Sequence, residues 1–259
     1  MAYKIVVANQ KGGVAKTTTA VNMADALMYM QYRVLLIDLD PQSNSTAVFK
    51  SGETDDIEKD LSDVVLEKAK ISECIEHTDF GDIVCGSKEL ANWDGQLLTV
   101  PGGTKRVRKA VKEIEDQYDF IIMDTPPNVG ALMRNALFSA DGIVTPLQAK
   151  RFALDGLSDF LDTVKELKED GNEGLEILGI LLTMYDQRNK QDKEVIKQLP
   201  EIGETLGIRI FKTPIRVCQD IENAIAGSKS LFRTKGNSNG AYDYADFISE
   251  VLDLVNKEG

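Results

Sequence analysis

The stretch at residues 3–19 constrains the fold more than any other part of the chain. It opens with an apolar, β-branched run at residues 3–7, breaks at Gly12 and Gly13, and leads into helical periodicity at residues 20–30. A lysine and three threonines stand between the glycine pair and that helical pattern. This order predicts a strand, a tight loop and a helix.

The predicted loop has the composition of a phosphate-binding site. Gly12 and Gly13 lack a Cβ, so the backbone can curl with its amides pointing inward, and the positive end of the following helix is aimed at the same place. The charge of Lys16 suits the outer phosphates, and the Thr17 hydroxyl suits magnesium. The alternative is a glycine turn with incidental lysines, which does not explain why all these features occur together.

Two further apolar runs end in carboxylates. Residues 34–37 are followed by Asp38 and Asp40, and residues 120–123 are followed by Asp124. A continuous apolar run is typical of a central parallel strand, and acids at its carboxyl end face the crevice where such sheets bind ligands. Magnesium prefers oxygen ligands and keeps most of its water, so Asp124 suits a magnesium site. Solvated loop carboxylates are the alternative for Asp38 and Asp40.

The remaining chain alternates strand and helix patterns without a repeat or linker. It predicts one α/β domain over residues 1–259, with a mostly parallel twisted sheet and helices on both faces. Together with the predicted phosphate loop, this organisation resembles that of a P-loop NTPase. Residues 43–82 are polar and acidic, and are expected to form loop and short helices along one edge, without recognisable chemistry. Further strands are predicted at residues 83–85, 142–146, 177–183 and 208–211, and helices at residues 104–117, 154–167, 192–206, 217–226 and 242–255.

Composition narrows the class of protein. The net charge of −12 would repel nucleic acid or an anionic membrane unless basic residues cluster locally. Cys74, Cys85 and Cys218 are widely separated, which favours reduced thiols in a cytoplasmic protein over disulfides or a thiolate metal site. A single histidine, His77, argues against histidine-based catalysis. No apolar run is long enough to span a bilayer.

One predicted helix, at residues 104–117, is unusually basic. It has two interpretations: a solvated helix face, or a contact surface for DNA phosphates or an acidic partner. Its basic residues are Lys105, Arg106, Arg108, Lys109 and Lys112.

The phosphate loop departs from the common pattern G-x-x-x-x-G-K-[ST]. Gln10 and Ala15 stand where that pattern has its framing glycines, and an extra lysine, Lys11, precedes the glycine pair. This resembles the deviant Walker A loop of the ParA/MinD ATPases. Blocks spread over most of the chain resemble ParA-type partition ATPases, and the early first strand implies the short form without an N-terminal DNA-reading domain. The blocks are residues 11–19, 36–42, 121–127, 152–157 and 182–186.

The resemblance implies ATP or ADP and Mg²⁺ as cofactors and a homodimer that forms on ATP binding. Lys11 would reach the phosphates of the other subunit, Lys16 would neutralise phosphate charge, and Asp40 would orient the attacking water. Hydrolysis would be slow, as suits a switch. The nucleotide would be bound by Lys11, Gly12, Gly13, Val14, Ala15, Lys16, Thr17 and Thr18, with adenine near Met184 and Pro214 and magnesium held by Thr17, Asp38 and Asp124.

The resemblance also implies partners. A DNA-partition ATPase of this kind would bind nucleoid DNA without sequence preference and would interact with a ParB-like centromere-binding protein. Gln219 departs from the family, which often has arginine there. The candidate DNA contacts are Arg188, Lys190, Arg216, Lys229 and Arg233.

Other functions remain as alternatives. A protein-cargo-positioning ATPase would use the same engine without DNA. A MinD-like membrane switch would need a basic amphipathic C-terminal helix, whereas the predicted helix at residues 242–255 is acidic, so no membrane binding is expected. A scaffold that binds nucleotide without hydrolysis would not need Asp40 and Lys11.

Ala15 stands where the family commonly has glycine. If the loop required a positive φ there, the methyl group would cost about 1–2 kcal/mol. We therefore expect an ordinary backbone conformation at Ala15.

Overall fold

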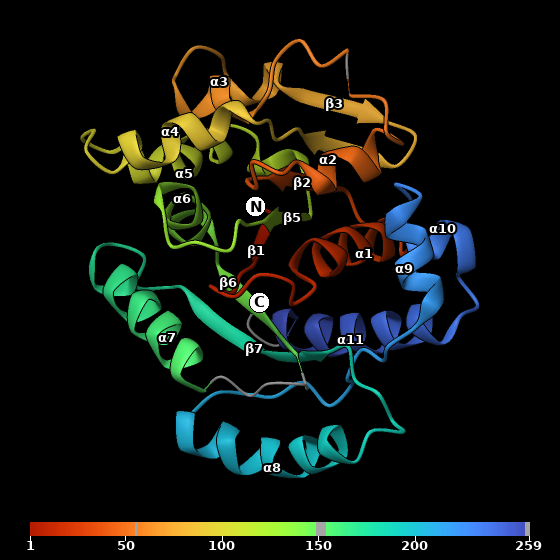
Figure 1. Cartoon of the computed structure of the whole chain (residues 1–259). Coiled ribbons are helices and arrows are strands. Elements are labelled where there is room, and N and C mark those ends of the chain that lie inside the picture. Colours follow the sequence, from red (N-terminus) through yellow and green to blue (C-terminus); the bar gives the residue numbers. More distant parts are fainter. Residues whose placement is uncertain (55, 149–153, 257–259) are drawn as a thin grey trace.

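The computed structural model describes residues 1–54, 56–148 and 154–256. Its centre is a seven-stranded sheet in the order β3-β4-β2-β5-β1-β6-β7 (Figure 1). All neighbouring strands run parallel except β3 and β4, which pair antiparallel. The strands are β1 (Tyr3–Val7), β2 (Val34–Asp38), β3 (Ile75–Thr78), β4 (Gly81–Val84), β5 (Phe120–Asp124), β6 (Gly142–Gln148) and β7 (Glu176–Thr183).

Helices cover both faces of the sheet, which confirms the predicted fold class (Figure 1). One face is covered by α3 (Leu61–Val65), α4 (Glu89–Leu97), α5 (Arg106–Val111), α6 (Ala131–Ser139) and α7 (Leu154–Glu169). The other face is covered by α1 (Lys16–Tyr29), α2 (Asn44–Phe49), α9 (Gln219–Ala226), α10 (Leu231–Lys235) and α11 (Asn239–Val255). The remaining elements are α8 (Lys190–Leu206) and the 3-10 turns η1 (Ile71–Glu73), η2 (Gly103–Lys105) and η3 (Glu115–Gln117).

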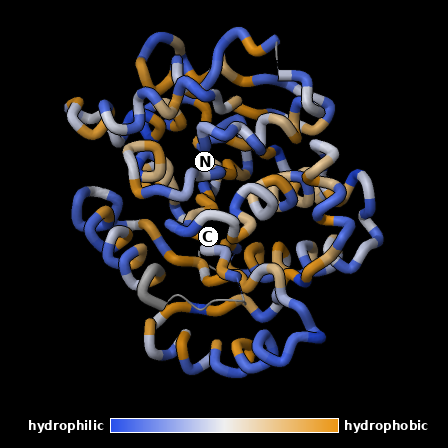
Figure 2. The backbone as a smooth tube through the Cα atoms, in the orientation of Figure 1, coloured by the Kyte–Doolittle hydropathy of each residue, from blue (hydrophilic) through white to orange (hydrophobic). Residues whose placement is uncertain are grey.

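Alternation along the central strands divides the core into two layers. In β2, Leu35 and Ile37 join the layer beneath α3–α7, while Val34 and Leu36 join the layer beneath α1 and α11. Both faces are therefore apolar, as a parallel sheet between helices requires. Figure 2 shows the hydrophobic stretches gathered at the strands, with hydrophilic residues on the outer helices.

Strand register brings the predicted functional residues to one edge. Val7, the last residue of β1, pairs with Asp124 at the end of β5, and Asp124 in turn pairs with Asp38 at the end of β2. The loop after β1 and both carboxylates consequently share the carboxyl edge of the sheet. Because parallel strands end together, this arrangement follows from the sequence pattern once the strand order is known.

Three predicted elements differ in the structure. The 43–82 segment contains the strand β3, which pairs with β4 as a hairpin at the sheet edge, where its polar residues are tolerated. The strand predicted at residues 208–211 is reduced to one bridge, between Ile180 and Ile210. The helix predicted at residues 104–117 is divided into η2, α5 and η3. Of the block at residues 152–157, residues 152 and 153 lie outside the described part of the chain.

Most basic side chains around α5 bind the chain itself. Lys105 Nζ donates to the Asp170 oxygen at 2.8 Å and Arg108 to the Gly171 oxygen at 2.6 Å, just beyond the end of α7. Cations at a helix C-terminus neutralise its unpaired carbonyls. Lys109 forms an ion pair with Glu67, and Arg106 donates to a backbone carbonyl of α3. These contacts anchor α7 and α3.

In the part of the chain that the structure describes, every helix is too short or too polar to cross a lipid bilayer.

Candidate active site

Three side-chain hydrogen bonds tie the loop between β1 and α1 to the neighbouring strands. Asn9 of the loop donates to a carbonyl of β6, and the side chains at the ends of β6 and β7 donate to carbonyls of the loop. The contacts are Asn9 Nδ2 to the Pro146 oxygen (2.7 Å), Thr183 Oγ1 to the Val14 oxygen (3.1 Å) and Gln148 Nε2 to the Gly13 oxygen (2.5 Å). The loop is thus preorganised by β6 and β7.

Ala15 adopts a left-handed conformation, with φ 67° and ψ 33°, so the expectation of an ordinary backbone was wrong. Gly13, two residues earlier, also has a positive φ of 71°. The chain needs both turns because the Ala15 carbonyl already accepts the first helical bond of α1, from Thr19 at 2.9 Å. The chain must therefore turn at Ala15, directly before the helix, and this turn fixes a positive φ at that residue.

Replacing Ala15 by glycine should raise the free energy of unfolding by about 1 kcal/mol, because glycine removes the left-handed strain of the methyl group. Urea unfolding measures this. Ala91→Gly, at an exposed position within α4, is the matched control and should lower stability by about 0.5–1 kcal/mol. A loss of stability at Ala15 as large as at Ala91 would contradict the explanation.

Lys16 opens α1 and folds back over the loop. Its Nζ donates to the Lys11 carbonyl at 3.1 Å, and its side chain is buried. Burial lowers the pKa of Lys16, while the charges of Asp124 and Asp40 act in the opposite direction. The ammonium thus lies between the phosphate loop and the carboxylates, where an anion would neutralise it.

Asp38 and Asp124 form a completely buried carboxylate pair. Thr46 donates to Asp38 Oδ2 from its backbone nitrogen at 2.8 Å and from its hydroxyl at 2.7 Å, and Ser45 Oγ donates to Asp124 Oδ2 at 2.7 Å. Burial, followed by the charge of Asp124, raises the pKa of Asp38 to about 8. Burial also raises the pKa of Asp124, to about 6, against the hydrogen bonds from Ser45 and Thr17.

This pair fits a divalent cation. Asp124 Oδ1 is buried and, within the described residues, has no hydrogen-bond partner, although the Thr17 hydroxyl bonds to the same carboxylate. Burying two carboxylates together is costly unless a positive charge lies beside them. Magnesium would supply that charge, and it prefers oxygen ligands such as carboxylates. Among the described residues, no group of three or more aspartate, glutamate, histidine or cysteine side chains could hold a metal ion.

Sequence reasoning missed the residues that hold these acids. Ser45 and Thr46 lie in the segment that we expected to carry no chemistry, and that expectation was wrong. Gly86, after β4, packs so closely that a Cβ there would lie 2.8 Å from the Asp38 carbonyl oxygen. The available signal was the group of hydroxyl residues Ser43, Ser45 and Thr46 shortly after Asp40, because it follows a strand that ends at the same sheet edge.

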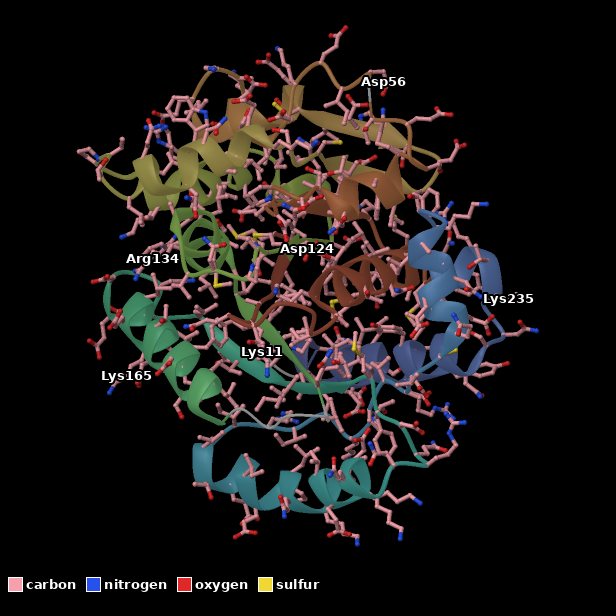
Figure 3. All side chains as sticks on the ribbon, in the orientation of Figure 1. Lys11, Asp56, Asp124, Arg134, Lys165 and Lys235 are labelled. Carbon is pink, nitrogen blue, oxygen red and sulfur yellow. The ribbon has the colours of Figure 1, made fainter. Side chains whose placement is uncertain are left out.

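Asp40 lies beside the buried pair, and Lys11 stands in the phosphate loop. Asp40 is 8% exposed, and its Oδ1 accepts from the Gln42 nitrogen at 2.9 Å, which orients the carboxylate. The Lys11 ammonium makes no hydrogen bond or ion pair with any residue the structure describes, and the side chain is partly exposed. Figure 3 shows Lys11 and Asp124 near the middle of the molecule, whereas Lys165 and Lys235 lie at its periphery.

A mainly apolar cavity of about 450 Å³ adjoins the loop. Met184, which the resemblance placed near adenine, lines this cavity, whereas Pro214 is not among its lining residues. The other lining residues could not be predicted from the sequence, because they come from segments far apart in the chain and no short sequence pattern connects them. The lining includes Ala15, Thr18, Met184, Ile215, Val217 and Ile221.

Three of the five candidate DNA contacts form ion pairs within the described chain. Arg216 forms an ion pair with Asp243 at 2.6 Å, and Arg233 bonds to Asp25 at 3.0 Å while stacking on the Phe80 ring. Both guanidinium groups therefore help to hold the fold together, and the two side chains are 29% and 39% exposed. Arg188, Lys190 and Lys229 are exposed, and Arg188 forms an ion pair with Asp186 at 3.2 Å.

Comparison with known proteins gives consistent matches. The model of a family described as "AAA domain" matches residues 2–177. The sporulation initiation inhibitor protein Soj of Bacillus subtilis (strain 168) is 35% identical over 249 residues, covering 95% of this chain and 97% of that protein. The chromosome-partitioning ATPase Soj of Thermus thermophilus is 34% identical over 252 residues, covering 97% of this chain and 96% of that protein.

A solved structure matches over the whole chain. It is described as cobyrinic acid a,c-diamide synthase from Mycobacterium smegmatis with bound ATP analog and magnesium. The TM-score is 0.86 at 29% identity, with 100% of this chain and 98% of that chain covered.

Proposed function

We propose a function from the premise that this chain belongs to the ParA-type partition ATPases. It is a Mg²⁺-dependent ATPase that converts ATP to ADP and phosphate. We propose further that it is a slow, dimerising switch in DNA partition. The observation that carries the proposed site is the buried pair Asp38 and Asp124 facing Lys16, with one Asp124 oxygen left for a cation.

The proposed mechanism uses positioning and charge. Loop amides between Gly12 and Thr18 hold the phosphates, and Lys16 neutralises charge that spreads over the transferred group. Thr17, Asp38 and Asp124 would hold magnesium through its water shell, and the bound ion supplies further neutralisation of phosphate charge. Asp40 accepts a hydrogen bond from the attacking water and orients it.

Lys11 gives hydrolysis its dependence on dimerisation. Its ammonium has no partner among the described residues of its own chain, so it is free to contact the phosphates bound by a second copy. Two ATP molecules would then be enclosed between subunits. Slow turnover lets the ATP-bound dimer persist long enough to be recognised by partners.

The proposed partners are DNA and a ParB-like centromere-binding protein. Arg188, Lys190 and Lys229 are exposed and could contact phosphates of nucleoid DNA, in spite of the net charge of −12. A MinD-like role is disfavoured because the apolar side of α11 is used internally. Phe247, Ile248 and Val251 are buried in the core layer beneath α1 and α11, so this face is not available to a membrane.

The test is ATP hydrolysis by the purified protein with and without nonspecific duplex DNA. DNA is expected to raise a slow basal rate several-fold, and DNA binding should weaken about tenfold or more between 50 and 200 mM salt, because phosphate contacts release counterions. An Arg188→Gln, Lys190→Gln double variant should lose the stimulation, whereas Lys165→Gln, Lys168→Gln in α7 should keep it. Hydrolysis indifferent to DNA would contradict partition through DNA and favour positioning of a protein cargo.

A further inference from the structure

One wall of the apolar cavity belongs to a segment that follows the edge of β7. We call residues 209–218 the pocket segment. Two backbone hydrogen bonds join it to β7: the Phe211 nitrogen donates to the Ile180 oxygen at 3.0 Å, and the Ile215 nitrogen donates to the Leu182 oxygen at 2.8 Å. Between these bonds, residues 212–214 leave the edge, so their backbone groups need other partners.

The C-terminal helix α11 supplies those partners. Glu250 accepts from the Lys212 nitrogen at 2.8 Å, from the Thr213 nitrogen at 2.9 Å and from the Thr213 hydroxyl at 2.7 Å. Asp243 accepts from the Arg216 nitrogen at 3.0 Å and from its guanidinium at 2.6 and 2.8 Å. Two acids of one helix therefore bind the pocket segment on either side of Pro214.

These acids share one face of α11 with an aromatic contact. Phe247 lies between Asp243 and Glu250 in the sequence and meets Phe211 edge to face, with ring centroids 4.9 Å apart. The spacing of four and three residues puts all three side chains on the same side of a helix. The pocket segment is thus held along two turns of α11.

The same helix also contacts the phosphate-loop side of the cavity. Tyr244, fully buried, brings its hydroxyl within 3.3 Å of Thr19 Oγ1 in α1, and it lines the cavity together with Ile215 and Val217. Adjacent residues of α11, Asp243 and Tyr244, therefore contact the pocket segment and α1, the helix that follows the phosphate loop. The helix sets the separation between the phosphate loop and the pocket segment.

We propose that Asp243 and Glu250 are positioning residues for the base of the bound nucleotide. They hold the pocket segment at the distance from the phosphate loop that lets one molecule fill both sites. A carboxylate is required because each acid accepts several N–H or O–H groups at once, whereas an amide would place an NH₂ group against these donors. This inference rests on the proposed nucleotide site.

The test compares two ligands that share the phosphate chain. ATP needs both sites, whereas inorganic tripolyphosphate needs only the phosphate loop. Asp243→Asn and Glu250→Gln are each expected to weaken ATP binding about tenfold, since several charge-assisted hydrogen bonds are lost, and to leave tripolyphosphate affinity unchanged. KM for ATP should rise while kcat at saturation stays the same. Asp253→Asn, which removes a charge from an exposed position of α11, is the control and should change neither affinity.

Equal weakening of ATP and tripolyphosphate would overturn the proposal, because it would indicate general disruption of the fold, and so would unchanged ATP affinity. If either variant fails to fold, Thr213→Val removes only one donor to Glu250 and should weaken ATP binding about threefold and tripolyphosphate binding not at all. A wild-type protein that binds neither ligand would overturn the proposed function, and the positioning role with it.

Discussion

Replacing Lys16 by glutamine should reduce ATP hydrolysis by at least about 100-fold, because a preorganised charge directed at the transferred phosphoryl group is lost. Steady-state phosphate release measures this directly. Lys165→Gln, which removes an exposed charge from α7, is the control and should leave the rate unchanged. A Lys16 variant that kept a tenth of the wild-type rate would contradict the assigned role.

Loss of activity in this variant should not reflect unfolding. Burial lowers the pKa of Lys16 below that of the unfolded chain, so at neutral pH the folded protein holds this proton less tightly than the unfolded protein does. The buried charge therefore lowers the free energy of unfolding at neutral pH. This cost shrinks as the pH rises through the lowered pKa of Lys16, because the folded protein then loses the proton. Thermal unfolding of Lys16→Gln without ligand should occur at the wild-type temperature or above it.

Mixing two inactive variants should restore hydrolysis. Asp40→Ala should lower turnover by about 100-fold while keeping ATP affinity, because Asp40 acts on the water and not on the nucleotide. Lys11→Ala should be equally inactive if Lys11 acts on the phosphates of the other subunit. In a mixed dimer, the site that retains Asp40 receives Lys11 from its partner, so this site has every required residue.

Half of randomly assembled dimers are mixed and one of their two sites is complete, so an equal mixture should reach about a quarter of the wild-type rate. Asp40→Ala mixed with Lys16→Gln is the control and should recover nothing, because Lys16 acts within its own subunit. No recovery in the Lys11 and Asp40 mixture would show that Lys11 acts within its own subunit or does not act at all.

The sequence by itself determined the fold class and the centre of the site. Strand and helix periods are local, and a glycine pair with a following lysine has few other interpretations, so the loop around Lys16 was predictable. Asp38 and Asp124 were predictable as neighbours because each directly follows an apolar run, and parallel strands end at one edge. These features depend on residues close together in the sequence or on a general rule of sheet topology.

Only the tertiary structure decided which side chains support that centre. Thr46 and Ser45 bond to Asp38 and Asp124, and Asp243 bonds to Arg216, a residue that sequence reasoning had assigned to DNA. Such pairs are separated by 8 to 79 residues, and no local pattern records them. The positive φ of Ala15 is of the same kind, since it depends on where β6 and β7 hold the loop. Long-range contacts choose among conformations that the local sequence leaves open, and for this reason the supporting residues became visible only in the folded chain.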